Sequence, residues 1–256
     1  MIAYHSPAKR ACNLRGGTAN LSRNEEGLLV KKVEVCSLIE SVGIVPAVRV
    51  STSEDAHFAA EWVARGGIPI VEITMTVEGC LELIAHLVRD HPKMVVGAGT
   101  ILDLETARCC IDAGAHFLTS PGLDVKLIEF AAKHELAVFS GALTPTEVIA
   151  AWRAGSDFVK VFPCAQMGGD SYIRALRGPL PKVPLIAAGG VNQQNATNFI
   201  LAGANAIGVG TELIPTESIE RRQGERIREL GHRFVGFVKD GRERLALRKG
   251  EALARK

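Results

Sequence analysis

The 256-residue chain is poor in aromatic side chains, which make up 5% of its residues, whereas apolar residues make up 47%. Its core must therefore be mainly aliphatic, as is usual inside an α/β barrel. No apolar run approaches the roughly 20 residues of a membrane-spanning helix, and the N-terminus lacks the apolar segment of a secretory signal. These absences predict a soluble, cytoplasmic protein that makes no membrane contact.

The sequence also lacks a metal-binding pattern. Its six cysteines include no C-x-x-C pair, and its seven histidines are scattered without the ligand spacing of zinc sites. Several cysteines lie in apolar segments, so we interpret them as small, reduced hydrophobic residues. We therefore expect no metal site.

Positive charge is concentrated at the two ends of the chain. Residues 1–32 carry six Lys or Arg against two Glu, and residues 239–256 carry seven against three acidic residues. Because the whole chain has a charge of +2, the middle is left with a charge of −6. This distribution argues against a nucleic-acid footprint on the folded part. We interpret the basic ends as solubilising; an RNA or membrane role for them is the alternative.

Eight short apolar segments alternate with amphipathic helical patterns along most of the chain, which indicates a parallel sheet buried on both faces. The predicted strands are Ile44–Val50, Pro69–Thr74, Met94–Ala98, Phe117–Thr119, Ala137–Phe139, Phe158–Phe162, Leu185–Ala188 and Ala206–Val209. Eight such units can close, so we predict the α/β class and a (β/α)₈ TIM barrel, a parallel eight-stranded barrel with outer helices. The predicted divisions are a poorly ordered N-terminal extension (1–31), the barrel (32–239) and a basic C-terminal tail (240–256).

Helix signals fit this alternation. Thr144 and Glu147 form a capping-box pattern, with proline at the first helical position. Asp103 and Asn192 are each placed to cap a following helix. A last, long and charged helix is predicted from about residue 216 to 239.

Lys160 interrupts an apolar strand. Because side chains alternate along a strand, it shares a face with Phe158 and Phe162. Burying an ammonium among apolar residues is costly, so this position favours a free amine, which can attack a carbonyl. The alternative is a strand-end lysine whose ammonium reaches water along its aliphatic stem. The strand alone does not decide between these readings.

Two other charged residues interrupt predicted strands. Glu72 could move protons beside an amine nucleophile, or it could form a structural ion pair, for instance with Lys160. Arg49 has a planar guanidinium that suits a substrate carboxylate; a salt bridge to Glu72 is the alternative. Because the active site of a barrel lies at the carboxyl ends of its strands, we expect these residues to share one site.

Glycine-rich runs follow the seventh and eighth predicted strands. They contain Gly189 and Gly190 before Asn192, and Gly210 before Thr211. Glycines let backbone N–H groups approach an anion, and barrels often bind phosphate at these strands. The runs therefore predict a phosphate site, with simple tight turns as the alternative.

Small residues at two other strand ends complete the predicted mouth. Thr100 follows the third predicted strand, where it could bind a carboxylate or cap a turn. Ser120-Pro121-Gly122 follows the fourth.

From about Val45 to Pro215 the chain resembles the 2-keto-3-deoxy-6-phosphogluconate (KDPG) aldolase family, which includes 4-hydroxy-2-oxoglutarate (KHG) aldolase activity. The matching runs, in family order and spacing, are VPAVRV, VEITMT, VGAGT, SPGLD, TPTE, FVKVFP, AAGGVN and GVGT. The resemblance covers roughly two thirds of the chain, and the runs together are highly specific. The resemblance implies a class I aldolase that cleaves KDPG to pyruvate and glyceraldehyde 3-phosphate. It also implies no cofactor and a homotrimer, and the charge distribution already predicts no nucleic-acid partner.

The resemblance also implies a role for each matching residue. Lys160 corresponds to the Schiff-base lysine and Glu72 to the general acid and base. Thr100 corresponds to a residue that binds the pyruvoyl carboxylate. The remaining matches are pocket-lining Pro121 and Phe162 and the phosphate-binding Gly189, Gly190, Gly210 and Thr211.

Three positions depart from the family pattern. Many members carry an arginine where this chain has Thr76, but Arg49 lies where other members place that arginine, so a carboxylate clamp is still expected. Ala188 replaces a common threonine and removes a hydroxyl near the distal end of the substrate. Ser140 replaces a proline, with no predicted consequence.

Three alternative functions stay open. The first is an aldolase for KHG or for an epimeric or non-phosphorylated 2-keto acid. The second is a phosphate-binding synthase or isomerase in which Lys160 is only an ion-pair partner. The third is a non-catalytic barrel that binds a phosphorylated sugar acid and regulates a partner. A pure binder has little need of a desolvated amine, which argues against the third.

Overall fold

Eight parallel strands form a closed barrel in which sequence neighbours pair and β8 pairs with β1. The computed structural model describes residues 31–254, and the side chains of residues 31–248. The strands are β1 (Ile44–Val48), β2 (Ile70–Thr74), β3 (Val95–Gly99), β4 (Phe117–Thr119), β5 (Ala137–Ala142), β6 (Phe158–Val161), β7 (Leu185–Ala188) and β8 (Ala206–Val209). The predicted (β/α)₈ barrel is confirmed. The predicted extension lies outside the described residues, apart from its last residue.

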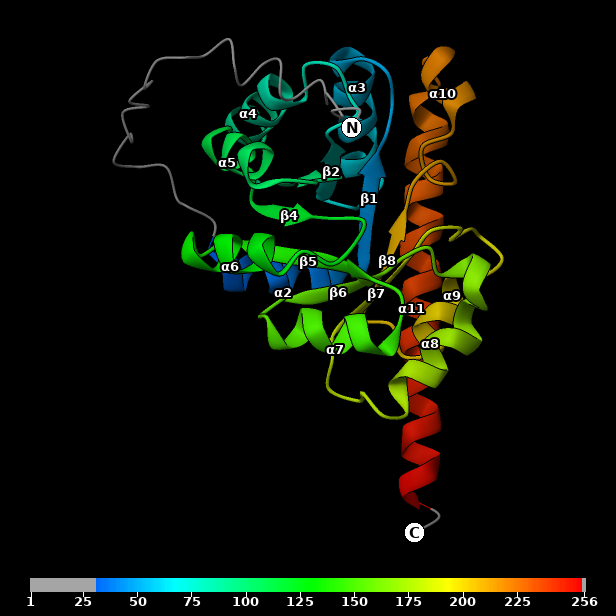
Figure 1. Ribbon diagram of the computed structural model, residues 1–256. Coiled ribbons are helices and arrows are strands. Elements are labelled where there is room, and N and C mark those ends of the chain that lie inside the picture. The colour runs from blue at the N-terminus through cyan, green and yellow to red at the C-terminus, as the bar shows by residue number, and fades with distance from the viewer. Residues whose placement is uncertain (1–30, 255–256) are drawn as a thin grey trace.

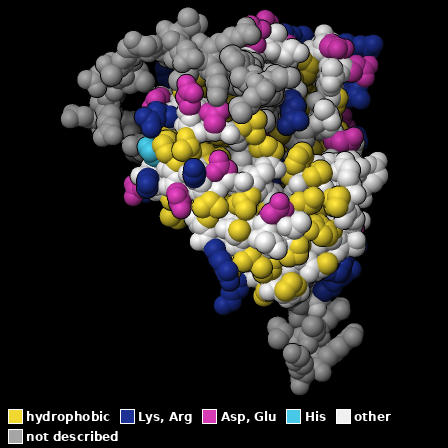
Figure 2. Space-filling view, viewed as in Figure 1, with side chains coloured by type: hydrophobic (Ala, Val, Ile, Leu, Met, Phe, Trp, Pro, Cys, Tyr) yellow, Lys and Arg dark blue, Asp and Glu magenta, His cyan; other side chains and the backbone are white. Residues whose placement is uncertain are grey.

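Helices surround the barrel (Figure 1). They are α2 (Lys32–Val42), α3 (Ser53–Arg65), α4 (Cys80–Asp90), α5 (Leu104–Asp112), α6 (Val125–Lys133), α7 (Pro145–Arg153), α8 (Gly169–Arg177), α9 (Ala196–Leu201), α10 (Thr216–Glu220) and α11 (Gly224–Ala254), with a 3₁₀ turn at Ala165–Met167. None of the described helices is both long and apolar enough to cross a bilayer. On the face in Figure 2, basic and acidic side chains are intermixed in the upper part, and hydrophobic side chains gather in the lower part between basic side chains at its edges.

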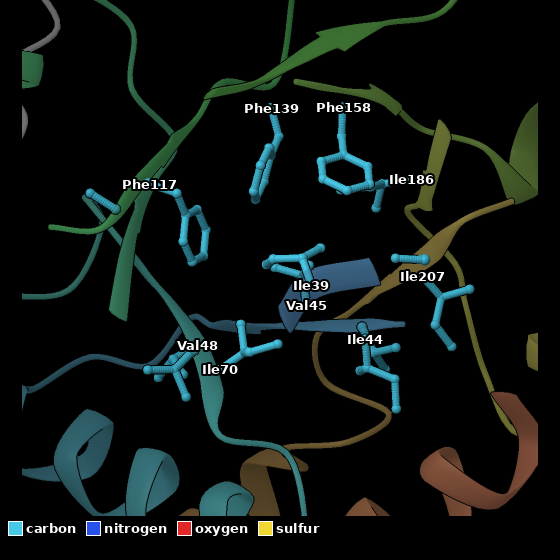
Figure 3. Close-up of a cluster of buried hydrophobic side chains, with 14 of the residues drawn as sticks. Ile39, Ile44, Val45, Val48, Ile70, Phe117, Phe139, Phe158, Ile186 and Ile207 are labelled. Atoms are coloured by element: carbon cyan, nitrogen blue, oxygen red, sulfur yellow. The ribbon is translucent and has the colours of Figure 1, made fainter. Parts of the chain in front are cut away.

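Three of the few aromatic residues form a layer inside the barrel (Figure 3). The ring centroids of Phe117 and Phe139 are 4.9 Å apart, and those of Phe139 and Phe158 are 5.2 Å apart. Gly97 makes room for this layer, because a Cβ there would lie 2.2 Å from the Phe117 ring. Phe158 precedes Lys160 by two residues on the same strand face. The aromatic layer therefore lies inside the barrel on the amino-end side of Lys160.

Helix α2 covers the amino end of the barrel. It contacts both β5 and β8, which are not neighbours in the barrel, so it crosses the opening. Its buried residues are Val35 and Ile39, and Ile39 lies among the strand side chains in Figure 3. Lys32 also forms a 2.9 Å ion pair with Asp157, just before β6. With this end covered, the carboxyl end is left as the entrance to the interior.

The C-terminal helical region differs from the prediction of one helix over residues 216–239. Helix α10 ends at Glu220, and Arg222 adopts a left-handed conformation with φ 51° that ends the helical path. The Arg222 guanidinium forms 3.0 Å ion pairs with Glu54 and Asp55 on α3, which hold this break in place.

Helix α11 then continues through residue 239, where the barrel domain was predicted to end, as far as Ala254 (Figure 1). Contacts beyond that point attach the helix to the barrel. Arg242 donates hydrogen bonds to the carbonyl oxygens of Glu40 and Ser41, and Gly241 is buried beside Ile200. Gly241 and Arg242, just after residue 239, therefore pack on the barrel.

Local capping explains where several helices begin. The Thr144 hydroxyl accepts a hydrogen bond from the Glu147 N–H, and the Glu147 carboxylate accepts one from the Thr144 N–H. The N–H groups of Thr144 and Leu143, which both donate to this carboxylate, lower the pKa of Glu147 below its usual value. Asp103 caps α5 as predicted. Asn192 does not cap α9 directly: its side chain accepts from the backbone of residues 194 and 195, and the helix starts later.

The half-buried imidazole of His116 should make the stability of the fold depend on pH. Its Nδ1 accepts a hydrogen bond from the Val96 N–H at 3.0 Å, and burial lowers the pKa of His116 below its usual 6.5. The folded state therefore favours neutral imidazole, so this contribution to the free energy of unfolding is present above about pH 6.5 and is lost as the pH falls through the folded-state pKa. We expect His116→Asn, which keeps an acceptor that does not titrate, to flatten this dependence. Melting temperatures across the pH range test this; parallel profiles for the two proteins would contradict it.

Candidate active site

The side chains of Lys160, Glu72 and Thr119 converge inside the carboxyl end of the barrel. Lys160 Nζ lies 3.2 Å from Glu72 Oε2, 3.3 Å from Glu72 Oε1 and 3.4 Å from Thr119 Oγ1. The Glu72 side chain is 3% exposed and that of Lys160 15% exposed. The lysine amine is therefore reachable from the mouth, with a buried carboxylate behind it.

Two glycines make room for this cluster. A Cβ on Gly99 would lie 2.1 Å from Glu72 Oε1, so the carboxylate occupies the space that a side chain on β3 would fill. Gly141 is in register with Lys160 on the neighbouring strand, and a Cβ there would lie 2.2 Å from the Pro121 carbonyl carbon. The absence of side chains at both positions lets Glu72 and the loop at Pro121 approach Lys160.

Gly99→Ala should therefore displace the Glu72 carboxylate. We expect kcat to fall about 100-fold, because a displacement of about 1 Å at a reacting group has costs of that order. Overpacking should lower the free energy of unfolding by about 1–3 kcal/mol. Gly236→Ala is the control, since a Cβ at that position on α11 meets nothing within 4 Å. Equal activity for Gly99→Ala and the wild type would show that the close fit around Glu72 is unimportant.

Arg49 and Thr100 both follow directly on strands that end at this mouth. Arg49 is exposed one residue beyond β1, and the described residues include no partner for its guanidinium, so the alternative salt bridge to Glu72 is not formed. Thr100 is half-buried and has φ 63°, a conformation uncommon for a threonine. Thr76, at the position of the missing family arginine, lies 2.8 Å from Thr74 between their hydroxyl oxygens.

The glycine runs form two turns at the ends of β7 and β8. Gly189 and Gly190 have φ values of 85° and 75°, which glycine adopts without steric cost. Gly189 lies against the Phe162 ring, which a Cβ would approach to 3.0 Å. On the neighbouring strand end, Gly210 is half-buried and Thr211 is exposed. Ala188 is 3% exposed and supplies no hydroxyl to these turns.

A separate cavity of about 540 Å³ lies at the opposite end of the barrel. Its lining includes Val183 and Asn205, which come just before β7 and β8, together with Arg177 and Arg242. Backbone carbonyls and Asn205 accept hydrogen bonds from both guanidinium groups. This cavity is therefore a structural feature of the amino end and lies away from Lys160.

Every residue predicted for the site lies in the middle or carboxyl-terminal part of a strand or within two residues after its end. Among them, Lys160 and Glu72 are in hydrogen-bond contact, as predicted. The sequence prediction missed Thr119, although it is two residues from inward-facing Phe117 and so lies on the same strand face. Ser140 lies on the opposite strand face from Gly141, and its buried hydroxyl has no hydrogen-bond partner among the described residues.

This arrangement fits carbonyl chemistry through an amine. A half-buried amine can add to a ketone, and an adjacent carboxylate can move the protons that the addition and the loss of water require. Backbone N–H groups at glycine turns of this kind can bind an anion.

Comparison with known proteins shows which family and which relatives the sequence matches. The family described as KDPG and KHG aldolase matches residues 35–230. The chain is 31% identical to the 2-dehydro-3-deoxy-phosphogluconate aldolase of Pseudomonas aeruginosa over 80% of this chain and 95% of that protein. It is 28% identical to the KHG/KDPG aldolase of Escherichia coli over 81% and 98%, respectively.

Among solved structures, KDPG aldolase from Legionella pneumophila, with pyruvate captured as a covalent carbinolamine, superposes with a TM-score of 0.72. That match has 27% sequence identity and covers 77% of this chain and 96% of the other.

Proposed function

Since the chain belongs to the KDPG and KHG aldolase family, we propose that it is a class I aldolase that cleaves KDPG to pyruvate and glyceraldehyde 3-phosphate. The observation that carries this proposal is the 3.2 Å approach of Lys160 Nζ to the Glu72 carboxylate at the carboxyl end of the barrel. The family places the chain among lyases, and Lys160 supplies the amine that a class I mechanism requires.

The reaction begins at Lys160. Its neutral amine adds to the C2 ketone of the substrate, forming a carbinolamine in which nitrogen is bonded to C2. Glu72 carries the proton that nitrogen releases to the C2 oxygen, which becomes a hydroxyl. Glu72 then delivers a second proton, taken from solvent, and the hydroxyl leaves as water; hydrolysis of the iminium later returns that proton to solvent. The resulting iminium withdraws electrons from the adjacent C3–C4 bond.

Cleavage follows from this electron demand. Glu72, acting through a water molecule, removes the proton of the C4 hydroxyl, and the C3–C4 electron pair moves into an enamine on Lys160. Glyceraldehyde 3-phosphate leaves as the aldehyde. Glu72 then helps protonate the enamine at C3, and water hydrolyses the iminium to release pyruvate. Each proton is recovered, so the sequence needs no metal or organic cofactor.

The remaining residues would bind the two charged ends of the substrate. Arg49 and Thr100 hold the carboxylate, and the turns at Gly189, Gly190, Gly210 and Thr211 hold the phosphate. Pro121 and Phe162 line the pocket between these ends. We also propose a cytoplasmic location and, from the family resemblance, a homotrimer. The mass of the particle in solution would test the trimer.

The substrate preference tests the phosphate assignment. We expect kcat/KM for KDPG to exceed that for its non-phosphorylated analogue or for KHG by about 10- to 100-fold, since hydrogen bonds to a charged group contribute about 1.5–3 kcal/mol each. Gly190→Ala should reduce this preference, because Gly190 has φ 75° and a Cβ there would lie 2.6 Å from that of Ala165. The rate of pyruvate release, measured with each substrate for the wild type and for Gly190→Ala, tests both expectations. A faster reaction with KHG would instead support a KHG aldolase, the alternative that the absence of a hydroxyl at Ala188 favours.

A further inference from the structure

We propose that His57, Glu61 and His91 form a binding site for a divalent transition metal ion, Zn²⁺ in the first instance, on the outside of the barrel. One ligand atom from each residue lies within 4.8 Å of the others. All three side chains are half-buried, so the group is partly desolvated yet open to solvent. The site lies outside the catalytic cluster and has no part in the proposed reaction.

The fold brings these ligands together from two helices. His57 and Glu61 are four residues apart on α3, so both project from the same face of that helix. His91 follows the last residue of α4, which packs beside α3. The ring centroids of His57 and His91 are 5.8 Å apart, with the rings tilted by 57°. The metal-ligand spacing sought in the sequence misses this group because His91 is far along the chain from the other two.

The ligand atoms are available to an ion. Within the described part of the chain, no lysine or arginine forms an ion pair with Glu61, and the two imidazoles have no hydrogen-bond partner. The nearby cations have other contacts: Arg65 lies over the Trp62 ring, and Arg89 pairs with Asp90. A half-buried carboxylate facing two imidazoles without a cation is a ligand set that a metal ion would satisfy.

The ligand chemistry selects the ion. Two imidazole nitrogens and one carboxylate oxygen suit Zn²⁺ and its transition-metal neighbours, whereas Mg²⁺ and Ca²⁺ prefer oxygen ligands alone. In a tetrahedral site with bonds of about 2.1 Å, ligand atoms are about 3.4 Å apart. Small side-chain rotations can close the present separations to that value. The fourth position is left for water.

The position of the site indicates a structural role. His91 ends α4 on the side where the chain turns back to enter β3, which is the amino side of the barrel, opposite to the mouth with Lys160. An ion here would join α3 to the segment that follows α4. We therefore expect Zn²⁺ to raise the melting temperature of the full chain.

The test is calorimetric titration of Zn²⁺ into the metal-stripped full chain, with melting temperatures measured in parallel. The wild type should bind one more Zn²⁺ per chain than His57→Ala or His91→Ala, or bind it at least about tenfold more tightly. His86→Ala is the matched control, since this exposed histidine on α4 lies outside the cluster, and it should bind like the wild type. Mg²⁺ should cause no shift in melting temperature. Zn²⁺ binding that both cluster variants leave unchanged would overturn the proposal.

A measurement on the wild type alone covers the case in which a variant fails to fold. Diethylpyrocarbonate modifies accessible imidazoles, and peptide mass analysis reports the extent at each histidine. Zn²⁺ should protect His57 and His91 and leave the modification of His86 unchanged. Equal modification of His57 and His91 with and without Zn²⁺ would overturn the site.

Discussion

Replacing Lys160 with arginine or methionine should lower kcat/KM for KDPG cleavage by at least about 10⁴-fold, as expected when the nucleophile of a covalent mechanism is removed. Neither side chain can form an iminium with the C2 ketone. The loss should appear in kcat, because carboxylate and phosphate binding does not depend on the amine. Steady-state kinetics with a coupled assay for pyruvate measure it.

The two substitutions separate catalysis from the ion pair. Lys160→Arg keeps a positive charge beside Glu72, whereas Lys160→Met leaves a buried carboxylate that is 3% exposed without its partner. Breaking a buried pair in this way costs about 3–5 kcal/mol. We therefore expect only the methionine variant to unfold markedly more easily, while both are inactive. An active arginine variant would assign Lys160 to the ion pair alone, as in the synthase or isomerase alternative.

Glu72→Gln should lower kcat by about 10²- to 10⁴-fold, the usual contribution of a general acid or base. The amide preserves the shape of the side chain and can still hydrogen-bond to Lys160, but it cannot take up and return protons. KM should change less than kcat. Kinetics at saturating substrate give the size of the loss.

The matched control for Glu72→Gln is Glu78→Gln. Glu78 is an exposed residue of the loop after β2, close in sequence to Glu72 but outside the barrel interior. Its substitution should leave kcat unchanged. If Glu72→Gln were as active as this control, proton transfer would have to be assigned to another group.

Much of the barrel was predictable because burial dominates its strands. The bounds of β4, β7 and β8 agree with the prediction, since each is a short, mainly apolar run. The end of β5 was missed. Ser140, Gly141 and Ala142 have weak strand propensity, but they pair with residues 159–161 of β6, so the neighbouring strand determines their conformation.

The C-terminal region was harder to predict because its structure depends on tertiary contacts. The break at Arg222 depends on ion pairs to α3, which no local pattern reveals. The continuation of α11 past residue 239 is supported by the hydrogen bonds that Arg242 donates to carbonyl oxygens in the last turn of α2. Arg222 and Arg242 each lie more than 150 residues along the chain from the residues of α3 and α2 that they contact. Local periodicity and charge runs therefore carry little information about these contacts.

The candidate site was predictable to the extent that a polar residue interrupts an apolar strand. Lys160 and Glu72 stand out for that reason, and the barrel rule places both at one mouth. The supporting positions do not stand out in the same way. Gly99 and Gly141 matter because of what would collide with a Cβ, and only the three-dimensional arrangement reveals that Glu72 and Pro121 fill those spaces.

Borohydride reduction in the presence of pyruvate tests the central claim most directly. If Lys160 forms an iminium, reduction converts it to a stable secondary amine, and peptide mass analysis should find one reduced pyruvate per chain on the peptide that contains Lys160. Lys160→Arg, treated in parallel, should carry none. Wild-type protein that stays unmodified, or that carries the adduct on a different lysine, would contradict the assignment of Lys160 as the nucleophile.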